Sequence, residues 1–158
     1  MKENHKNVYE LKAVADGRAV ALESVGDRIF AEKVLGDGIA VIPDNGRIVS
    51  PVSGTVVQIS GQKHLYCIRT AEGTNILVHI GLGTVKLDGK GFASLVDTGD
   101  TVEAGTPLAQ VDLAVLKENG YDTCIPVIVS GQEVLEEKSC RLGEIKAGAS
   151  VMMEYTLK

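Results

Sequence analysis

Apolar residues along the chain come in short runs, and glycine-containing turns separate most of these runs. From Leu11 onward such a turn follows about every 8 to 12 residues. The runs are rich in Val, Ile and Leu, and their spacing is typical of short strands in a sandwich or barrel. We therefore predict an all-β fold, an antiparallel β-sandwich or barrel with a few short helical turns.

Two pairs of segments repeat one another. Residues 16–20 (DGRAV) are echoed by residues 53–57 (SGTVV), and residues 102–108 (VEAGTPL) are echoed by residues 145–151 (IKAGASV). Each copy sets a turn glycine beside a short β run, as expected for equivalent corners of a duplicated barrel. The echoes predict a pseudo-duplicated topology.

Helical periodicity is scarce in this sequence. The best candidate is the segment 113–120. Asp112 stands where an N-cap accepts backbone N–H groups, and Gly120 stands at the C′ position, where a left-handed conformation often ends a helix. We predict one short helix here.

The length of the chain, 158 residues, is that of one domain. No interior linker rich in Ser, Pro or charged residues interrupts it. The first residues are polar and lack the period of the rest. We predict a flexible N-terminal tail at residues 1–10, in which His5 has no role, followed by a single domain at residues 11–158.

Charge and hydropathy exclude several classes of function. The net charge is −5 and no basic stripe with aromatic residues is present, so nucleic acid is not an expected partner. No apolar segment approaches the roughly 20 residues that cross a bilayer, and no signal-peptide core follows the start. Three widely spaced cysteines, Cys67, Cys124 and Cys140, fit free thiols in a reducing compartment. We expect a soluble, cytoplasmic protein that is not embedded in a membrane.

One run, residues 73–85 (GTNILVHIGLGTV), places a titratable ring inside an apolar strand. Residues 76–80 are apolar and largely β-branched apart from His79, and glycines bound the run. Fifteen residues upstream stands His64, the only other histidine outside the predicted tail. Residues 64–69 form a second strand candidate, so we predict that the two histidines share a hairpin.

Two registers of this hairpin are open. A four-residue loop at 70–73 sets His64 opposite His79, with Cβ atoms roughly 4.5–5.5 Å apart, so that both rings can grip one small anion. A three-residue loop at 71–73 shifts the pairing by one and sends the rings to opposite faces. We take the facing pair as the hypothesis.

These residues resemble the phosphorylation-site signature of the glucose-family IIA domain of the bacterial phosphoenolpyruvate sugar phosphotransferase system. The matching positions are Gly73, Ile76, Leu77, Val78, His79, Ile80, Gly81, Leu82, Thr84 and Val85. Other segments fit in the order of the family: residues 36–38 with Pro43, residues 50–55, His64 and residues 87–92. The resemblance runs from about Leu11 to the C-terminus.

The resemblance implies an antiparallel β-sandwich that acts as a phosphocarrier, one component of a phosphotransferase rather than a complete sugar kinase, with no cofactor. Nε2 of His79 would accept a phosphoryl group from phospho-HPr and pass it to a cysteine of a IIB domain. An imidazole suits this task because, with a pKa near 6.5, it is largely neutral at pH 7. His64 would stabilise the phosphoryl oxygens.

The resemblance gives expectations for four further positions. Thr84 is expected to reach the ring or the phosphate, and Asp37 to lie at the rim and attract basic residues of a partner. Gln62 stands where the family usually has threonine, and its amide is expected to orient His64. Gly83 stands where the family usually has aspartate, which removes a carboxylate from the rim.

Other functions compete with the phosphocarrier. In a regulatory binding protein, the unphosphorylated face around the histidines would dock onto transporters or metabolic enzymes, and phosphorylation would release it. A zinc hydrolase is disfavoured, because catalytic zinc takes three protein ligands and the related peptidases use an H-x-H pair that this sequence lacks. We expect no dedicated metal site, although His64 and His79 could bind adventitious zinc.

Overall fold

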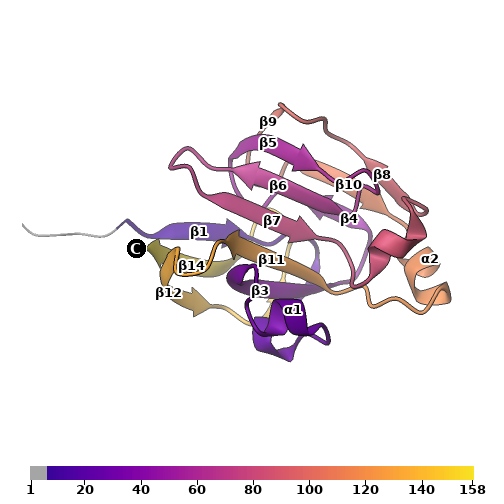
Figure 1. The fold of residues 1–158 in the computed structure, drawn as a ribbon, viewed down its shortest axis with the longest axis horizontal. Helices are drawn as coiled ribbons and strands as arrows, with labels where there is room; N and C mark the ends of the chain where they lie inside the picture. The colour runs from indigo at the N-terminus through magenta and orange to yellow at the C-terminus, as the bar shows by residue number, and fades with distance from the viewer. Residues whose placement is uncertain (1–6) are drawn as a thin grey trace, which may run out of the picture.

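The computed structural model describes residues 7–158, and most of its regular structure is β-strand (Figure 1). The strands are β1 (Tyr9–Lys12), β2 (Gly17–Ala21), β3 (Gly36–Pro43), β4 (Arg47–Val49), β5 (Gly54–Ile59), β6 (Leu65–Arg69), β7 (Asn75–His79), β8 (Phe92–Ser94), β9 (Thr101–Val102), β10 (Pro107–Val111), β11 (Ile125–Ser130), β12 (Leu135–Cys140), β13 (Gly143–Ile145) and β14 (Val151–Leu157). The helices are α1 (Arg28–Ala31) and α2 (Leu113–Glu118), and the 3-10 turns are η1 (Leu22–Ser24) and η2 (Thr84–Leu87).

The strands form three sheets. The largest has the order β13-β2-β3-β11-β7-β6-β5-β9, and the two smaller ones have the orders β1-β14-β12 and β4-β10-β8. The strand pairs between residues 7 and 158 are antiparallel. Buried Val, Leu, Ile and Ala side chains from all three sheets form one core. The predicted antiparallel all-β fold is confirmed.

The sheet orders are those of a duplicated unit. When β1, β2 and β3 are exchanged with β4, β5 and β6, and β11 to β14 with β7 to β10, the order of the large sheet becomes its own reverse. The same exchange turns one small sheet into the other. Gly17 and Gly54, predicted as equivalent, open β2 and β5. At both places a Cβ atom would lie within 2.2 Å of a carbonyl oxygen on the paired strand, so only glycine fits.

The second predicted echo is a pair of turns that meet. The N–H of Gly105 donates to the carbonyl of Ser50 at 2.8 Å, and the N–H of Gly148 donates to that of Ala13 at 2.9 Å. The two glycines lie against each other, because a Cβ atom on Gly148 would come within 2.9 Å of the Cα atom of Gly105. The predicted pseudo-duplication therefore extends to backbone contacts.

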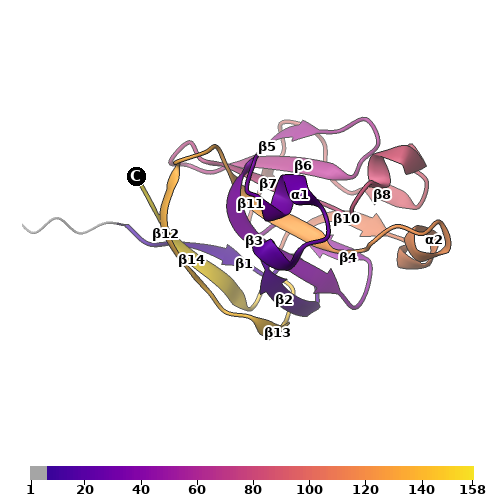
Figure 2. The same cartoon turned by 60° about the horizontal axis from the view of Figure 1, so that its bottom comes forward.

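A second apolar cluster covers the outer face of the large sheet. In both views α1 lies beside β3 (Figures 1 and 2). Asp27 caps α1 by accepting the N–H of Ile29 at 2.9 Å. Phe30 of α1 packs in the same cluster as Ala40 of β3 and Ile128 of β11. This layer brings Phe30 to the end of β7.

The predicted helix is confirmed as α2. Asp112 caps it, with its carboxylate accepting the N–H groups of Ala114 and Val115 at 3.1 and 3.4 Å. Gly120 follows the C-cap with φ of +80°. None of the helices in residues 7–158 is long and apolar enough to cross a membrane.

The first strand begins inside the range expected to be a tail. Tyr9 and Glu10 belong to β1 because they pair with Tyr155 and Glu154 of β14. Residues 1–6 of that range, with His5, lie outside the described residues. The flexible tail and the single domain at residues 11–158 stay predictions.

Candidate functional site

The β6–β7 hairpin has the alternative register. Leu65, and not His64, pairs with His79, so the loop is the three-residue one at 71–73. Gly73 takes the φ of +86° that the third position of such a loop requires. The expected pairing of His64 directly opposite His79 is therefore wrong.

The two rings nevertheless lie side by side. His64 precedes β6, and Lys63 before it has a left-handed φ of +62°, so strand alternation does not govern the direction of the His64 side chain. The carbonyl of His64 accepts the N–H of Ile80 at 2.7 Å, which ties this turn to the end of β7. The ring centroids of His64 and His79 are 4.9 Å apart, and the rings are nearly perpendicular at 84°. A turn, rather than strand pairing, brings the histidines together.

His79 is held in one tautomer. Its Nδ1 lies 2.7 Å from the carbonyl oxygen of Gly81. A carbonyl oxygen only accepts, so Nδ1 carries the proton and Nε2 keeps a free lone pair. Burial lowers the pKa of His79, although the Gly81 hydrogen bond and the charge of Asp27 oppose it. Phe30 packs on the ring with centroids 4.9 Å apart, and the side chain stays partly exposed. This arrangement offers a neutral nucleophile at Nε2.

His64 is 6% exposed and is contacted by Ser60. The hydroxyl oxygen of Ser60 lies 3.1 Å from Nδ1 of His64 and accepts the N–H groups of His64 and Leu65 at 3.2 Å. Burial, and then the neighbouring His79, lower the pKa of His64 to about 4. Gln62 makes no side-chain hydrogen bond within residues 7–158. Ser60, rather than Gln62, contacts the His64 ring, and the orienting role expected of Gln62 stays a prediction.

Thr84 closes the loop that follows β7. It is fully buried, and its hydroxyl donates to the carbonyl of Ile80 at 2.7 Å. The hydroxyl proton is therefore used within the loop rather than toward the ring of His79. Gly81 and Gly83 have φ of +80° and +72°, and a Cβ atom on Gly81 would lie 2.5 Å from Cγ2 of Thr84. Thr84 thus fixes the backbone that presents the Gly81 carbonyl.

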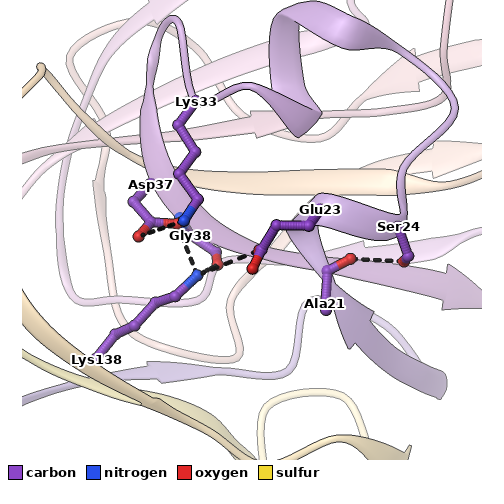
Figure 3. A network of polar contacts seen from close by, with 7 residues as sticks. All are labelled: Ala21, Glu23, Ser24, Lys33, Asp37, Gly38 and Lys138. Atoms are coloured by element: carbon purple, nitrogen blue, oxygen red, sulfur yellow. Dashed lines mark hydrogen bonds and ion pairs between the residues drawn. The ribbon is translucent and has the colours of Figure 1, made fainter.

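Asp37 is engaged within the protein (Figure 3). Nζ of Lys138 lies 2.6 Å from Oδ1 of Asp37 and 2.9 Å from the carbonyl of Gly38, and Nζ of Lys33 lies 3.5 Å from Oδ2. Glu23 of η1 lies 3.8 Å from the same Lys138. Burial alone raises the pKa of Asp37, but the Lys138 and Gly38 hydrogen bonds and the lysine charges lower it overall. The carboxylate joins β3 to β12, and its role toward a partner stays a prediction.

Thiols and metal ligands add no second site in the described residues. No group of three or more His, Cys, Asp or Glu side chains that could hold a metal occurs among residues 7–158. Cys67, Cys124 and Cys140 are free thiols. Burial raises the pKa of all three, that of Cys124 to about 12, so they are poor nucleophiles. The histidine pair is the candidate site.

Sequence reasoning missed two residues of this site. A serine in a turn has no distinguishing pattern, so nothing marked Ser60. Phe30 had a signal, because Asp27 stands as an N-cap at the start of a short helix that contains Ile29 and Phe30. That helix was too short to show a period.

Residues 9–135 match the family described as phosphoenolpyruvate-dependent sugar phosphotransferase system, EIIA 1. The glucose-specific EIIA component of Oceanobacillus iheyensis is 36% identical over 155 residues, which cover 98% of this chain and 94% of that protein. The glucose-specific EIICBA component of Streptococcus pneumoniae is 46% identical over 143 residues, which cover 90% of this chain. The chain spans about a fifth of the length of the EIICBA relatives it matches.

A solved structure has the same fold. Glucose permease IIA from Mycoplasma capricolum superposes with a TM-score of 0.83 at 38% sequence identity. The superposition covers 93% of this chain and 96% of that one. By sequence and by fold, the chain belongs to the EIIA 1 family of the phosphoenolpyruvate-dependent sugar phosphotransferase system.

Proposed function

We propose that this chain is a phosphocarrier that takes a phosphoryl group from phospho-HPr on Nε2 of His79 and passes it to a cysteine of a IIB domain. The observation that carries the proposal is the hydrogen bond from Nδ1 to the Gly81 carbonyl, which leaves Nε2 unprotonated. The family and the EIIA and EIICBA relatives support it. We place the carrier in the cytoplasm, where it would meet its donor.

In the first step the lone pair of Nε2 attacks phosphorus. The bond from phosphorus to the HPr imidazole breaks, and its electron pair returns to that ring. Because Nδ1 of His79 keeps its proton, the phosphorylated imidazole carries positive charge. The Gly81 carbonyl, 2.7 Å from Nδ1, stabilises that charge.

In the second step a cysteine thiolate of the IIB domain attacks phosphorus. The Nε2–P bond breaks and its electron pair returns to Nε2, so His79 is restored with its Nδ1 proton in place. His64, with its ring centroid 4.9 Å from that of His79, donates to the phosphoryl oxygens. Burial lowers the pKa of His64 to about 4, so the ring is neutral near pH 7 and donates through the one N–H that a neutral imidazole carries.

Incubation with phosphoenolpyruvate, enzyme I and HPr tests the first step. Mass mapping is expected to find an acid-labile phosphate on the peptide that contains His79. The His79→Gln variant should take up none, while His64→Gln should accept a phosphoryl group but fail to pass it to IIB. If labelled HPr leaves the wild-type chain unmarked, the proposal fails. If His64→Gln cannot be phosphorylated, the division of roles is wrong.

Regulatory binding is a second candidate function. Ile29 of α1 and Val85 of η2 are 52% and 47% exposed. The helix α1 contacts the His79 ring through Phe30, and η2 begins five residues after His79. A phosphoryl group on His79 would oppose an apolar contact here through charge and desolvation. Pull-downs with phosphorylated and unphosphorylated chain test this. A pure carrier should retain no non-transport protein in either state.

A further inference from the structure

The hydroxyl of Ser60 has three polar neighbours, and one of them must receive its proton. Its oxygen accepts the N–H groups of His64 and Leu65, both at 3.2 Å. Nδ1 of His64 lies 3.1 Å from the same oxygen. A hydroxyl oxygen has two lone pairs, and the two N–H groups fill them. The O–H proton is left for the ring, so Ser60 donates to Nδ1.

A bond donated to Nδ1 decides the tautomer of His64. A neutral imidazole carries one proton, so when Nδ1 accepts, Nε2 carries the N–H. His79 has the opposite tautomer, with its proton on Nδ1 and its lone pair on Nε2. The pair therefore presents one nucleophile and one donor. The donor ring does not compete for phosphorus, because its Nε2 has no free lone pair.

Resting on the proposed function, we propose that Ser60 is a positioning residue for phosphoryl transfer, which holds His64 as an Nε2–H donor toward the phosphoryl group on His79. The turn that contains Ser60 supports this role. Its N–H donates to the carbonyl of Leu65 at 3.0 Å, and its carbonyl accepts the N–H of Lys63 at 2.9 Å. These hydrogen bonds hold the Ser60 hydroxyl, the His64 ring and the start of β6 in fixed positions relative to one another.

The hydroxyl beside His64 comes from a different position than in the family that the sequence resembles. The residue two before His64, usually a threonine, is Gln62, whose side chain makes no hydrogen bond within residues 7–158. Ser60 lies two residues earlier, and the left-handed turn at Lys63 brings it back beside the ring. Ser60 therefore supplies a hydroxyl that position 62 lacks.

Nitrogen chemical shifts of the unphosphorylated full chain, labelled with 15N in histidine, read the tautomer directly. We expect His64 to show a protonated Nε2 and an unprotonated Nδ1. Ser60→Ala should give a mixture of tautomers, and Ser60→Thr should restore the wild-type state. Ser150→Ala is the matched control, because Ser150 accepts the N–H of Lys146 at 2.8 Å in another turn and is hydrogen-bonded to neither His64 nor His79. Its spectrum should match wild type.

Transfer kinetics give a second readout. Ser60→Ala should accept from phospho-HPr at close to the wild-type rate, because the tautomer of His79 is unchanged. It should pass the group to IIB roughly tenfold more slowly, the effect of one lost hydrogen bond. Ser60→Cys, a weaker donor of similar size, should lie between wild type and alanine, and it serves as the test if the alanine variant does not fold.

Two results overturn the proposal. One is a wild-type tautomer in every Ser60 variant, alanine or cysteine, that folds, and the other is a Ser60→Ala variant that passes the phosphoryl group to IIB at the wild-type rate. If the wild-type chain accepts no phosphoryl group, the proposed function fails and the role in transfer falls with it. The spectra still decide separately whether Ser60 sets the tautomer.

Discussion

The carbonyl oxygen of Gly81 accepts a hydrogen bond from Nδ1 of His79 across 2.7 Å, and the backbone at Gly81 has a conformation that glycine favours. The φ of Gly81 is +80°, and a Cβ atom there would lie 2.5 Å from Cγ2 of Thr84 and 3.1 Å from the carbonyl oxygen of Asp122. The tautomer of His79 therefore depends on a glycine two residues later.

Gly81→Ala should impair both stability and phosphoryl acceptance. The strained φ and the contact with Thr84 should destabilise the fold by about 1–3 kcal/mol, and the shifted carbonyl should slow uptake from phospho-HPr. Gly73→Ala is the control, because Gly73 has φ of +86° with open space around it and lies at the far end of β7. Urea unfolding and uptake rates measure both effects. If Gly81→Ala is destabilised but takes up the phosphoryl group at the wild-type rate, the position of the Gly81 carbonyl does not control uptake.

The low pKa of His64 should make stability fall in mild acid. The folded-state pKa of about 4 lies below the ordinary 6.5, so the unfolded chain binds the proton first as pH falls. Stability from neutral His64 is complete above pH 6.5 and is lost between pH 6.5 and about 4. Wild type should lose about 2–3 kcal/mol more than His64→Gln across this window in urea unfolding. If the free energy of unfolding falls equally with pH in the two proteins, the lowered pKa of His64 is contradicted.

The ion pair between Lys138 and Asp37 should be structural. The two side chains are 18% and 22% exposed, so Lys138→Met leaves a largely buried carboxylate with Lys33 and the N–H of Gly38 as its remaining partners. We expect a loss of about 1–3 kcal/mol, and a double variant with Asp37→Asn that is less destabilised than the sum of the single changes. Arg141→Met, which breaks a more exposed pair with Glu154, should lose less than about 1 kcal/mol. Strict additivity in the Lys138–Asp37 cycle would show that the pair is uncoupled.

The fold class could be predicted from the sequence, but the pairing and order of the strands could not. Strand period and turn glycines are local signals, and Gly17 and Gly54 are constrained by the neighbouring strand, so their echo survives in the sequence. The pairing of β3 with β11 joins Ile39 to Val127, and no local pattern encodes a contact between residues so far apart. The symmetric order of the large sheet therefore needed coordinates.

The two histidines of the site could be predicted from the sequence, but the residues and backbone geometry that position them could not. The hairpin register was wrong because Gly73 is compatible with both loops, and the proximity of the rings depends on a positive φ at Lys63, which the sequence does not mark. The same turn at Lys63 places Ser60, and not Gln62, beside the His64 ring, and the sequence does not mark this either. The ion pair of Asp37 with Lys138 was equally invisible, because its partner lies on a distant strand.

Gly83 allows the missing rim carboxylate to be restored. The residue is exposed and has φ of +72°, and the nearest atom to a Cβ there would be Cδ1 of Tyr121 at 3.5 Å. Aspartate tolerates the left-handed region better than most residues, so Gly83→Asp should destabilise the fold by only about 1 kcal/mol. If the donor carrier is basic, the new charge should raise the rate of phosphoryl uptake several-fold at low ionic strength.

Gly83→Asn separates charge from backbone strain, because asparagine has the same shape and a similar tolerance of positive φ. Uptake by the asparagine variant should match wild type, while the advantage of the aspartate variant should fade as salt screens the exposed charge. Stopped-flow measurement of transfer from phospho-HPr at low and high salt tests both statements. Equal rates for the two variants at low salt would mean that the donor does not sense charge at this rim, and that the glycine is there for the φ of the loop alone.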